Sequence, residues 1–235
     1  MRSARAALAR LLEGNRRFVA GTPEHDGETT RARRRALTAS QAPFAIILGC
    51  SDSRVPAEIV FDQGLGDLFV IRVAGNIVAP SLVGSVEFAA AQFGTRLVVV
   101  LGHSGCGAVQ ATLDELRQPA EQQSRNLQSI VDRIRPSVEP LLAAEAGHDR
   151  EALLRHAVRA NILASADHLR HGSAILEHLR ETDGLLIVGA EYSLETGIVD
   201  FFEGVPADIE HENVGHGTAR RTRVGRLARG PTNRG

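Results

Sequence analysis

Both cysteines of the chain lie in two short motifs that are far apart in the sequence. Cys50 begins the run Cys-Ser-Asp-Ser-Arg, and Cys106 closes the run His-Ser-Gly-Cys, which begins at His103. Two thiolates and one imidazole form a ligand set suited to Zn²⁺, and three protein ligands leave a fourth tetrahedral position open, as in catalytic zinc sites. The two motifs together predict a catalytic zinc site held by Cys50, His103 and Cys106.

Asp52 and Arg54, in the first motif, have a natural role beside a zinc-bound water. A carboxylate at hydrogen-bond distance can accept the proton of a zinc hydroxide and fix its orientation, and a bidentate arginine keeps that carboxylate ionised. We therefore predict that Asp52 and Arg54 form a catalytic pair. The alternative is that Asp52 itself takes the fourth zinc position, which would be a closed, resting site.

Each of these residues also has an ordinary structural explanation. Cys50 and Cys106 could form a disulfide, or could be inert buried thiols, as free cysteines often are. His103 alone could be a core histidine with satisfied hydrogen bonds, and Asp52 with Arg54 could be an ordinary ion pair. The combination of both motifs favours the zinc site.

Short apolar runs without alternation predict strands that are buried on both faces of a parallel sheet. They lie at Phe44–Leu48, Leu68–Val73, Leu97–Leu101 and Leu185–Val188. Segments with helical spacing lie between and beside them, at roughly 56–62, 80–93, 106–118, 124–146 and 150–181. This order predicts an α/β fold with a central, mostly parallel sheet, right-handed crossovers and helices on both faces. A last run, Gly197–Phe202, follows too closely for a crossover and is predicted to be an antiparallel edge strand.

Both cysteine motifs directly follow predicted strands. Ligands in open α/β sheets bind beyond the carboxyl ends of the strands, where the strand order reverses. Cys106 is expected to open a helix, where the amides around Gly105 and Gly107 would stabilise its thiolate. The predicted elements therefore place both motifs where such folds bind ligands.

The two ends of the chain differ from this central region. Residues 4–20 have helical spacing, and a polar, arginine-rich stretch follows to about Ser40, so we predict an N-terminal helical arm over 1–40. The zinc-binding α/β catalytic domain is expected over 41–208. The apolar content collapses beyond it, which predicts a disordered, arginine-rich tail over 209–235.

The composition excludes several classes of partner. The formal net charge of −1 gives no general reason to expect nucleic acid or an anionic membrane as a partner. The arginine-rich tail has no aromatic residues for base stacking, and no apolar run approaches the ~18 residues of a membrane span. Two cysteines do not make a disulfide framework, so a cytoplasmic protein is expected.

At these motifs the chain resembles the β-carbonic anhydrases. The similarity extends from about Leu11 to Phe202, through GNRRFVAG, CSDSRVP, DLFVIRVAGN, GSVEFAA, LGHSGCGA and VGAEYSLETGIVDFF. The resemblance implies the fold of that family and zinc bound by the two cysteines and the histidine, with an Asp–Arg catalytic pair. It also implies reversible hydration of carbon dioxide to bicarbonate and a proton, by a homodimer or a dimer of dimers with its sites at the dimer interface.

The resemblance further implies a small apolar pocket for carbon dioxide. Phe69 and Phe88 lie where the family has aromatic residues, Ala74 where it has a small aliphatic residue, and Gln41 where one subgroup has a glutamine that hydrogen-bonds substrate. Gly107 completes the expected substrate-binding set. Ordinary core packing is the alternative for each phenylalanine.

One subgroup of the family is switched off when the aspartate binds zinc and bicarbonate occupies a second pocket. That subgroup has a tryptophan and a tyrosine where this chain has Ile47 and Gly189, although Gly49 and Arg72 match it. We therefore predict a constitutively open site. The proton-shuttle residue cannot be identified from the sequence; His25, His148 and His211 are the candidates.

Three other functions remain open at this point. The same metal site could hydrolyse carbonyl sulfide or carbon disulfide, or it could stabilise a non-catalytic regulatory domain that binds zinc. A dithiol redox protein is the third, and the absence of a Cys-x-x-Cys motif argues against it.

Overall fold

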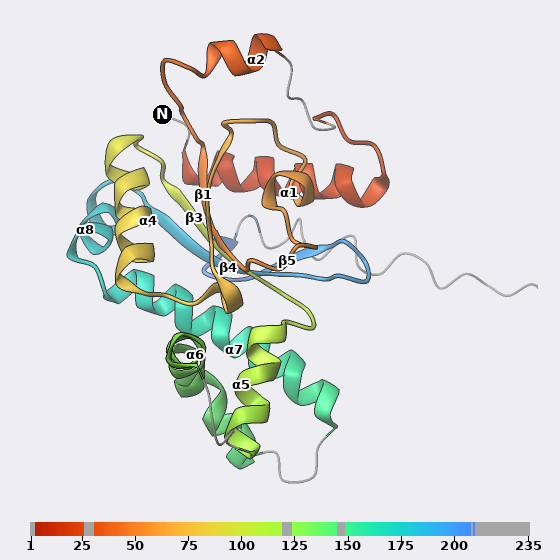
Figure 1. Ribbon diagram of the computed structural model, residues 1–235. Coiled ribbons are helices and arrows are strands. Elements are labelled where there is room, and N and C mark those ends of the chain that lie inside the picture. Colours follow the sequence, from red (N-terminus) through yellow and green to blue (C-terminus); the bar gives the residue numbers. More distant parts are fainter. Residues whose placement is uncertain (1–2, 26–30, 119–123, 145–148, 208, 210–235) are drawn as a thin grey trace, which may run out of the picture. The chain divides into compact units, whose positions relative to one another are not determined.

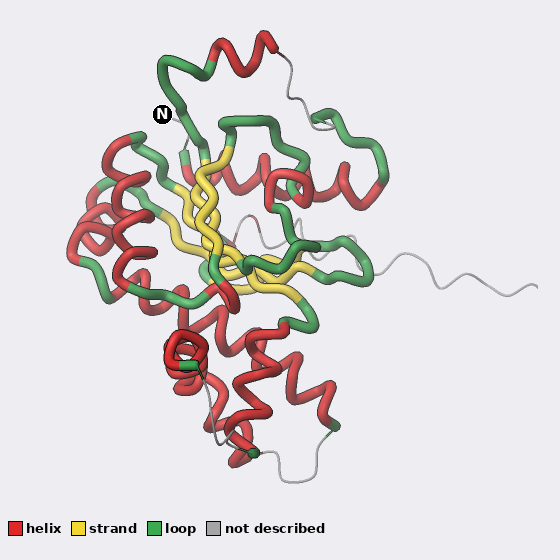
Figure 2. Tube along the Cα trace, viewed as in Figure 1, coloured by secondary structure: helices red, strands yellow, loops and turns green. Residues whose placement is uncertain are grey.

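The structure is a computed structural model that describes residues 3–25, 31–118, 124–144, 149–207 and 209 (Figures 1 and 2). The chain divides into two units, residues 1–205 and 206–235, and the fold below is that of the first. The predicted tail over 209–235 lies outside the described residues except for Ile209.

Five strands of the described region form one sheet, in the order β2-β1-β3-β4-β5. They are β1 (Ala45–Gly49), β2 (Leu68–Arg72), β3 (Leu97–His103), β4 (Leu186–Tyr192) and β5 (Val199–Glu203). The first four are parallel, and β5 runs antiparallel to β4 at the edge, as predicted. Because β1 continues to β2 on one side and the chain then crosses to β3 on the other, the strand order reverses between β1 and β3.

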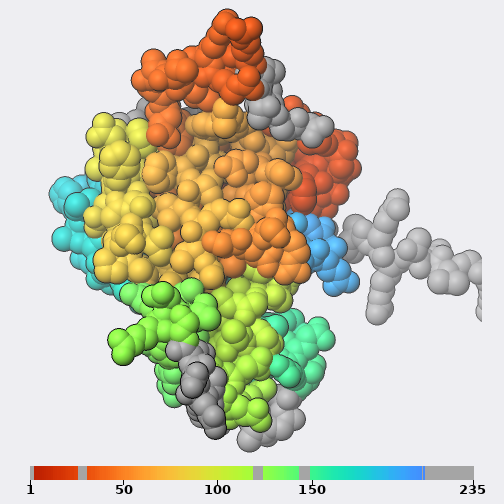
Figure 3. Space-filling model, viewed as in Figure 1, coloured from red at the N-terminus to blue at the C-terminus, as the bar shows by residue number. Residues whose placement is uncertain are grey.

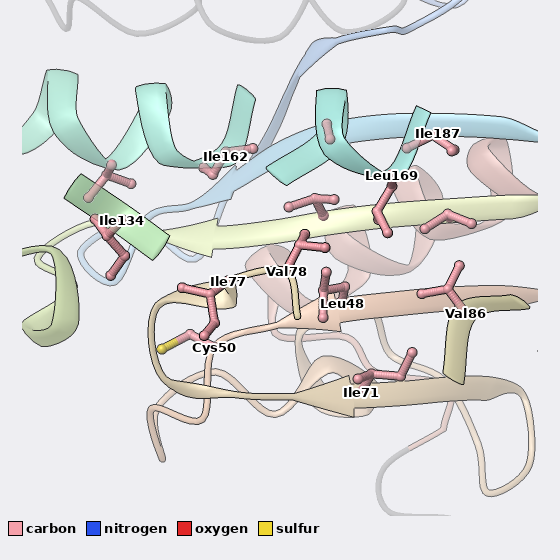
Figure 4. Packing of buried hydrophobic residues seen from close by; sticks show 14 of the residues in the cluster. Leu48, Cys50, Ile71, Ile77, Val78, Val86, Ile134, Ile162, Leu169 and Ile187 are labelled. Atoms are coloured by element: carbon pink, nitrogen blue, oxygen red, sulfur yellow. The ribbon is translucent and has the colours of Figure 1, made fainter. Parts of the chain in front are cut away.

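Helices cover both faces of this sheet, and every residue of β1 and β3 is buried. On one face α4 (Pro80–Gln92) contacts β1 and β2, and α7 (Arg150–His171) contacts β3 and β4. Figure 4 shows part of the hydrophobic core on this face, with Leu48 and Val78 beside Ile162 and Leu169 of α7. On the opposite face α1 (Ala4–Ala20) contacts β1 and β3 (Figure 1).

The remaining helices are short or lie beside α7. They are α2 (Arg31–Ala36), α3 (Ala57–Val60), α5 (Gly107–Arg117), α6 (Arg125–Ala144), α8 (Ala174–Thr182) and the single 3₁₀ turn η1 (Ala74–Asn76). The expected helix over 150–181 is two helices, because α7 ends before Gly172 and the Ser173 side chain caps α8 by accepting the N–H of Leu176 at 3.2 Å. No helix in the described ranges has both the length and the apolar content needed to cross a membrane.

Candidate metal centre

The two cysteine motifs meet where the strand order reverses. Cys50 directly follows β1, and His103 is the last residue of β3, its parallel neighbour. Gly49 and Leu101 are paired in the register of these strands, so the chain emerges from both at the same edge of the sheet. Cys106 directly precedes α5 and occupies its N-cap position, as the sequence predicted.

The three expected ligand residues converge. One ligand atom from each of Cys50, His103 and Cys106 lies within 4.8 Å of the others, and all three residues are buried. Both cysteines are free thiols, so the disulfide considered from the sequence is absent. Two sulfurs and one ring nitrogen at this separation can hold a single metal ion.

The hydrogen bonds of His103 prepare one of its ring nitrogens for a metal. Nδ1 lies 3.0 Å from the carbonyl oxygen of Ser104. Because a carbonyl only accepts, Nδ1 carries a proton, and in the neutral ring Nε2 carries the lone pair. Nε2 is buried and has no hydrogen-bond partner among the described residues. A buried nitrogen without a partner needs an explanation, and metal-binding histidines commonly donate their other ring N–H in this way. The donor set therefore fits a zinc ion.

The two sulfurs are not equivalent. A hydrogen bond from the Cys106 thiol, with smaller contributions from His103 and from the backbone amides of Gly75 and Asp52, outweighs burial and lowers the pKa of the Cys50 thiol. The same contact, together with burial, raises the pKa of Cys106. Burial opposes a charge on His103, but its pKa is raised by the Cys50 sulfur, the Ser104 carbonyl and the Asp52 carboxylate. These contacts therefore favour the thiolate form of Cys50 over that of Cys106.

Asp52 is held by Arg54 through paired hydrogen bonds. Arg54 Nε donates to Oδ1 at 2.9 Å, Nη2 donates to Oδ2 at 2.7 Å, and the Arg54 backbone N–H also donates to Oδ1, at 3.0 Å. These contacts with Arg54 outweigh burial and hold the pKa of the Asp52 carboxyl far below its usual range. Asp52 Oδ2 lies 3.8 Å from His103 Nε2, so an ionised carboxylate stands beside the three ligands.

Arg72, on β2, secures the backbone between Cys50 and Asp52. Its Nε donates to the carbonyl of Cys50 at 3.0 Å, and its Nη2 donates to the carbonyl of Asp52 at 2.5 Å. The Ser51 N–H donates to the carbonyl of Val73 at 3.2 Å. Because its guanidinium is used in this way, Arg72 acts here as a clamp on the loop that carries Cys50 and Asp52.

Gly75 was not among the expected site residues, although its N–H donates to Cys50 Sγ at 3.4 Å. Gly75 has a φ of 72°, in the left-handed region that favours glycine. The signal for it was a glycine two residues after a predicted strand, which is a common pattern and gave no hint of a sulfur contact.

The residues expected to line the substrate pocket lie in different places within one chain. Ala74 belongs to η1 beside Gly75, and Gly107 is the first residue of α5, directly after Cys106. Phe69 and Phe88 pack together at 6.3 Å between ring centroids, on β2 and α4. Gln41 is exposed and precedes β1, whereas Cys50 follows that strand.

The proton-shuttle candidates are also scattered. The backbone N–H of His25 donates to Asp62 at 2.8 Å, and its ring Nδ1 is buried without a hydrogen-bond partner in the described chain. His148 and His211 lie outside the described residues. The geometry therefore selects none of the three.

Comparison with known proteins agrees with this geometry. Residues 45–199 match the family model described as carbonic anhydrase. The chain is 42% identical to carbonic anhydrase 2 of Mycobacterium tuberculosis over 194 residues, which cover 82% of this chain and 89% of that protein. It is 48% identical to a carbonic anhydrase of Mycolicibacterium smegmatis over 145 residues, covering 62% of this chain and 68% of that protein.

Solved structures support the same fold. The fold resembles a structure of the tetrameric β-carbonic anhydrases of Sordaria macrospora with a TM-score of 0.63 and 21% identity, over 83% of this chain and 96% of that one. From the matched family model and the curated relatives, with the Cys-His-Cys cluster at the strand switch point, the chain belongs to the β-carbonic anhydrase family of enzymes.

Proposed function

We propose that this protein catalyses the zinc-dependent, reversible hydration of carbon dioxide to bicarbonate and a proton. One observation carries the proposal: the donor atoms of Cys50, His103 and Cys106 lie within 4.8 Å of one another, and the Asp52 carboxylate lies 3.8 Å from His103 Nε2. Structural zinc sites have four protein ligands, whereas three ligands leave a position for water or substrate. The arrangement therefore favours catalysis over a purely structural role.

In this proposal Cys50, His103 and Cys106 would hold the ion. Bound zinc supplies Lewis-acid chemistry that makes water a nucleophile far below its ordinary pKa. Ser104 fixes the His103 ring by accepting its Nδ1–H at 3.0 Å. This contact leaves Nε2 directed at the cluster with its lone pair free.

Asp52 provides a hydrogen-bond acceptor beside the proposed ligands. Arg54 keeps the carboxylate ionised, so that both oxygens act as acceptors only. Oδ1 already accepts two hydrogen bonds from Arg54, whereas Oδ2 accepts one and is the oxygen close to His103. We propose that Oδ2 accepts a hydrogen bond from the nucleophilic water. This hydrogen bond would orient the water so that the lone pair of its oxygen faces carbon dioxide. Because Asp52 is paired with Arg54, we infer that it does not take the fourth zinc position, which leaves that position open.

The test combines zinc analysis by mass spectrometry with stopped-flow hydration of carbon dioxide. We expect one zinc per chain and a hydration rate that is lost in Cys50→Ser together with the metal. Asp52→Asn should retain the zinc and lose at least about 100-fold in kcat/KM. Stoichiometric zinc with no hydration from neutral to alkaline pH would favour a non-catalytic zinc-binding domain. The same assay with carbonyl sulfide as substrate distinguishes carbon dioxide hydration from carbonyl sulfide hydrolysis.

We also propose that two chains pair through the β2–α4 side of the sheet. β2 is the terminal strand on that side, and Figure 3 shows the segments around β2 and α4 next to each other at the surface. The rings of Phe69, Phe88 and Phe93 cluster there, and Phe88 is 53% exposed. Exposed apolar clusters of this kind mark protein interfaces.

Pairing on this side would bring Phe69, Phe88 and Gln41 of one chain toward the other chain's metal centre. The Sordaria macrospora relatives are tetrameric, which supports a homodimer or a dimer of dimers here. Light scattering should give a multiple of the 25.2 kDa chain mass. Phe88→Glu should yield monomers that keep zinc and lose hydration. A cytoplasmic location remains a prediction, and we propose neither nucleic acid nor a membrane as a partner.

A further inference from the structure

The turn η1 presents its backbone to Cys50 in an unusual conformation. Gly75 and Asn76 both have a positive φ, of 72° and 43°. The Gly75 N–H donates to Cys50 Sγ at 3.4 Å. A Cβ at Gly75 would lie 2.8 Å from Ile134 Cδ1, the end of a flexible side chain, and 3.1 Å from Ala108 Cβ, so the positive φ is the main requirement for glycine. Two consecutive left-handed residues persist only where the surroundings hold them.

Two buried polar side chains of α7 hold this turn. Asn161 Nδ2 donates to the carbonyl of Gly75 at 2.7 Å, and Ser165 Oγ donates to the carbonyl of Asn76 at 3.0 Å. They are four residues apart and therefore share one face of the helix. Asn161 is 2% exposed and Ser165 is 5% exposed. Buried polar groups are costly unless they are paired, and these two are paired with the turn.

The same stretch of α7 packs against the strand that carries His103. A Cβ added to Gly102 would lie 2.5 Å from Ile162 Cδ1, so helix and strand approach as closely as glycine permits. Gly102 directly precedes His103. Figure 4 shows Ile162 on α7 above the sheet, at the end of the core where Cys50 lies. One helix thus contacts both the turn that donates to Cys50 and the strand end that carries His103.

We propose that Asn161 and Ser165 are positioning residues that hold the Gly75 amide against Cys50 Sγ and so set the affinity of the metal centre. The inference rests on the proposed zinc site and goes beyond it, because neither residue is a ligand or touches the reacting atoms. Groups that hydrogen-bond to metal ligands typically change metal affinity or activity by about 10- to 100-fold when they are lost. Asn161→Ala removes this donor from the Gly75 carbonyl, and we expect the turn to relax away from its left-handed conformation.

The experiment compares Asn161→Ala and Ser165→Ala with Ser173→Ala. Ser173 is a matched control because its hydroxyl is similarly buried, at 6% exposure, but donates to Glu87 and caps α8. Zinc release from the holoprotein is followed with a chromophoric chelator, and the Co²⁺-substituted protein is examined for its thiolate-to-cobalt charge-transfer band. We expect release about tenfold faster in Asn161→Ala, a smaller increase in Ser165→Ala and the wild-type rate in Ser173→Ala. The cobalt band should shift in the first two variants only.

Three outcomes would overturn the proposal. Wild-type release rates and unshifted cobalt bands in both Asn161→Ala and Ser165→Ala would show that the turn is held without them. An equal acceleration in Ser173→Ala would show general loosening of the fold. If Asn161→Ala does not fold, Ser165→Ala decides alone. A wild-type protein that takes up neither Zn²⁺ nor Co²⁺ would instead defeat the proposed metal centre, and this inference with it.

Discussion

Asp52 and Arg54 are joined by two side-chain hydrogen bonds, 2.9 Å from Nε to Oδ1 and 2.7 Å from Nη2 to Oδ2. The guanidinium is 59% exposed, while the carboxylate is 18% exposed and lies 3.8 Å from His103 Nε2. An exposed ion pair contributes little to stability. We therefore infer that the main role of Arg54 is to orient the Asp52 carboxylate.

Replacing Arg54 with lysine should lower kcat/KM for carbon dioxide hydration by about 100-fold. A lysine ammonium is a point charge that cannot make the paired bonds, and a reacting group misplaced by about 1 Å costs roughly that factor. Zinc content should stay at one per chain, because the ligands are other residues. The control is Arg155→Lys, because Arg155 forms an exposed ion pair with Glu151 at 2.9 Å. Its kcat/KM, measured by stopped flow, should equal that of the wild type. A wild-type rate in Arg54→Lys would remove Arg54 from the mechanism.

The convergence of Cys50, His103 and Cys106 could be predicted from the sequence because two of these residues lie at the ends of neighbouring strands. Cys50 follows β1 and His103 ends β3, and the carboxyl ends of adjacent parallel strands meet at one edge of a sheet. The strand runs were predicted to within a few residues. β4 extends to Tyr192. The prediction stopped at Val188 because Gly189 and Glu191 interrupt the apolar run from which the strand was predicted.

The supporting contacts could not be predicted in this way. Asn161 and Ser165 are distant in sequence from Gly75, and single polar residues in a helix usually face solvent. Only the packing of α7 against η1 shows that they point inward. The break between α7 and α8 was missed because Gly172 and Ser173 interrupt a segment that keeps helical spacing on both sides.

Removing zinc should lower the melting temperature by about 8 °C. A metal that binds only the folded chain adds about 2.7 kcal/mol at 100 times its Kd, and each 1 kcal/mol shifts Tm by about 3 °C in a chain of this size. Scanning fluorimetry with dipicolinate, followed by added zinc, measures the shift and its reversal. The chelator should not affect His103→Ala. An unchanged Tm in wild-type protein shown to be free of zinc would contradict a metal bound at a buried site.

The Asp62 carboxylate should make the free energy of unfolding fall as the pH is lowered into the acid range. Burial opposes its charge, but hydrogen bonds from Arg17 and from the backbone amides of Glu24 and His25 lower its pKa in the folded state. A lowered folded pKa stabilises the fold above the unfolded value, about 3.9, and this contribution is lost as the pH falls through the folded pKa. Asp62→Asn should therefore cost about 2 kcal/mol at pH 7.

The cost of Asp62→Asn should shrink below about pH 4. Asparagine tolerates the φ of 45° at this position. It keeps one acceptor oxygen, but its NH₂ replaces the other, so the variant removes the charge together with part of the hydrogen bonding. Urea denaturation at pH 7, 5 and 3.5 measures the difference from wild type. The exposed Asp132→Asn, 57% exposed in the wild type, is the control and should change stability by less than about 1 kcal/mol. A cost that is constant across pH would mean that the carboxylate charge is irrelevant.

Two helical glycines should respond in opposite directions to alanine. Alanine normally stabilises a helix interior by about 1 kcal/mol over glycine. At Gly14, in α1, the new Cβ would lie 1.9 Å from the backbone oxygen of Phe61 and 2.8 Å from Gln63 Nε2. A backbone atom cannot move aside as a flexible side chain can. At Gly84, in α4, a Cβ would meet no heavy atom within 4 Å in the described part of the chain.

Gly14→Ala should therefore be destabilised by about 2 kcal/mol, because overpacking costs about 1–3 kcal/mol and outweighs the helix propensity. Gly84→Ala should gain up to about 1 kcal/mol. Urea midpoints of the zinc-loaded variants, with unchanged m-values, measure both. If Gly14→Ala were as stable as wild type, α1 would not pack against α3 as closely as the 1.9 Å approach requires. The packing of α1 on the face of the sheet opposite α7 would then contribute less to stability than the burial of Leu8 and Leu11 in α1 indicates.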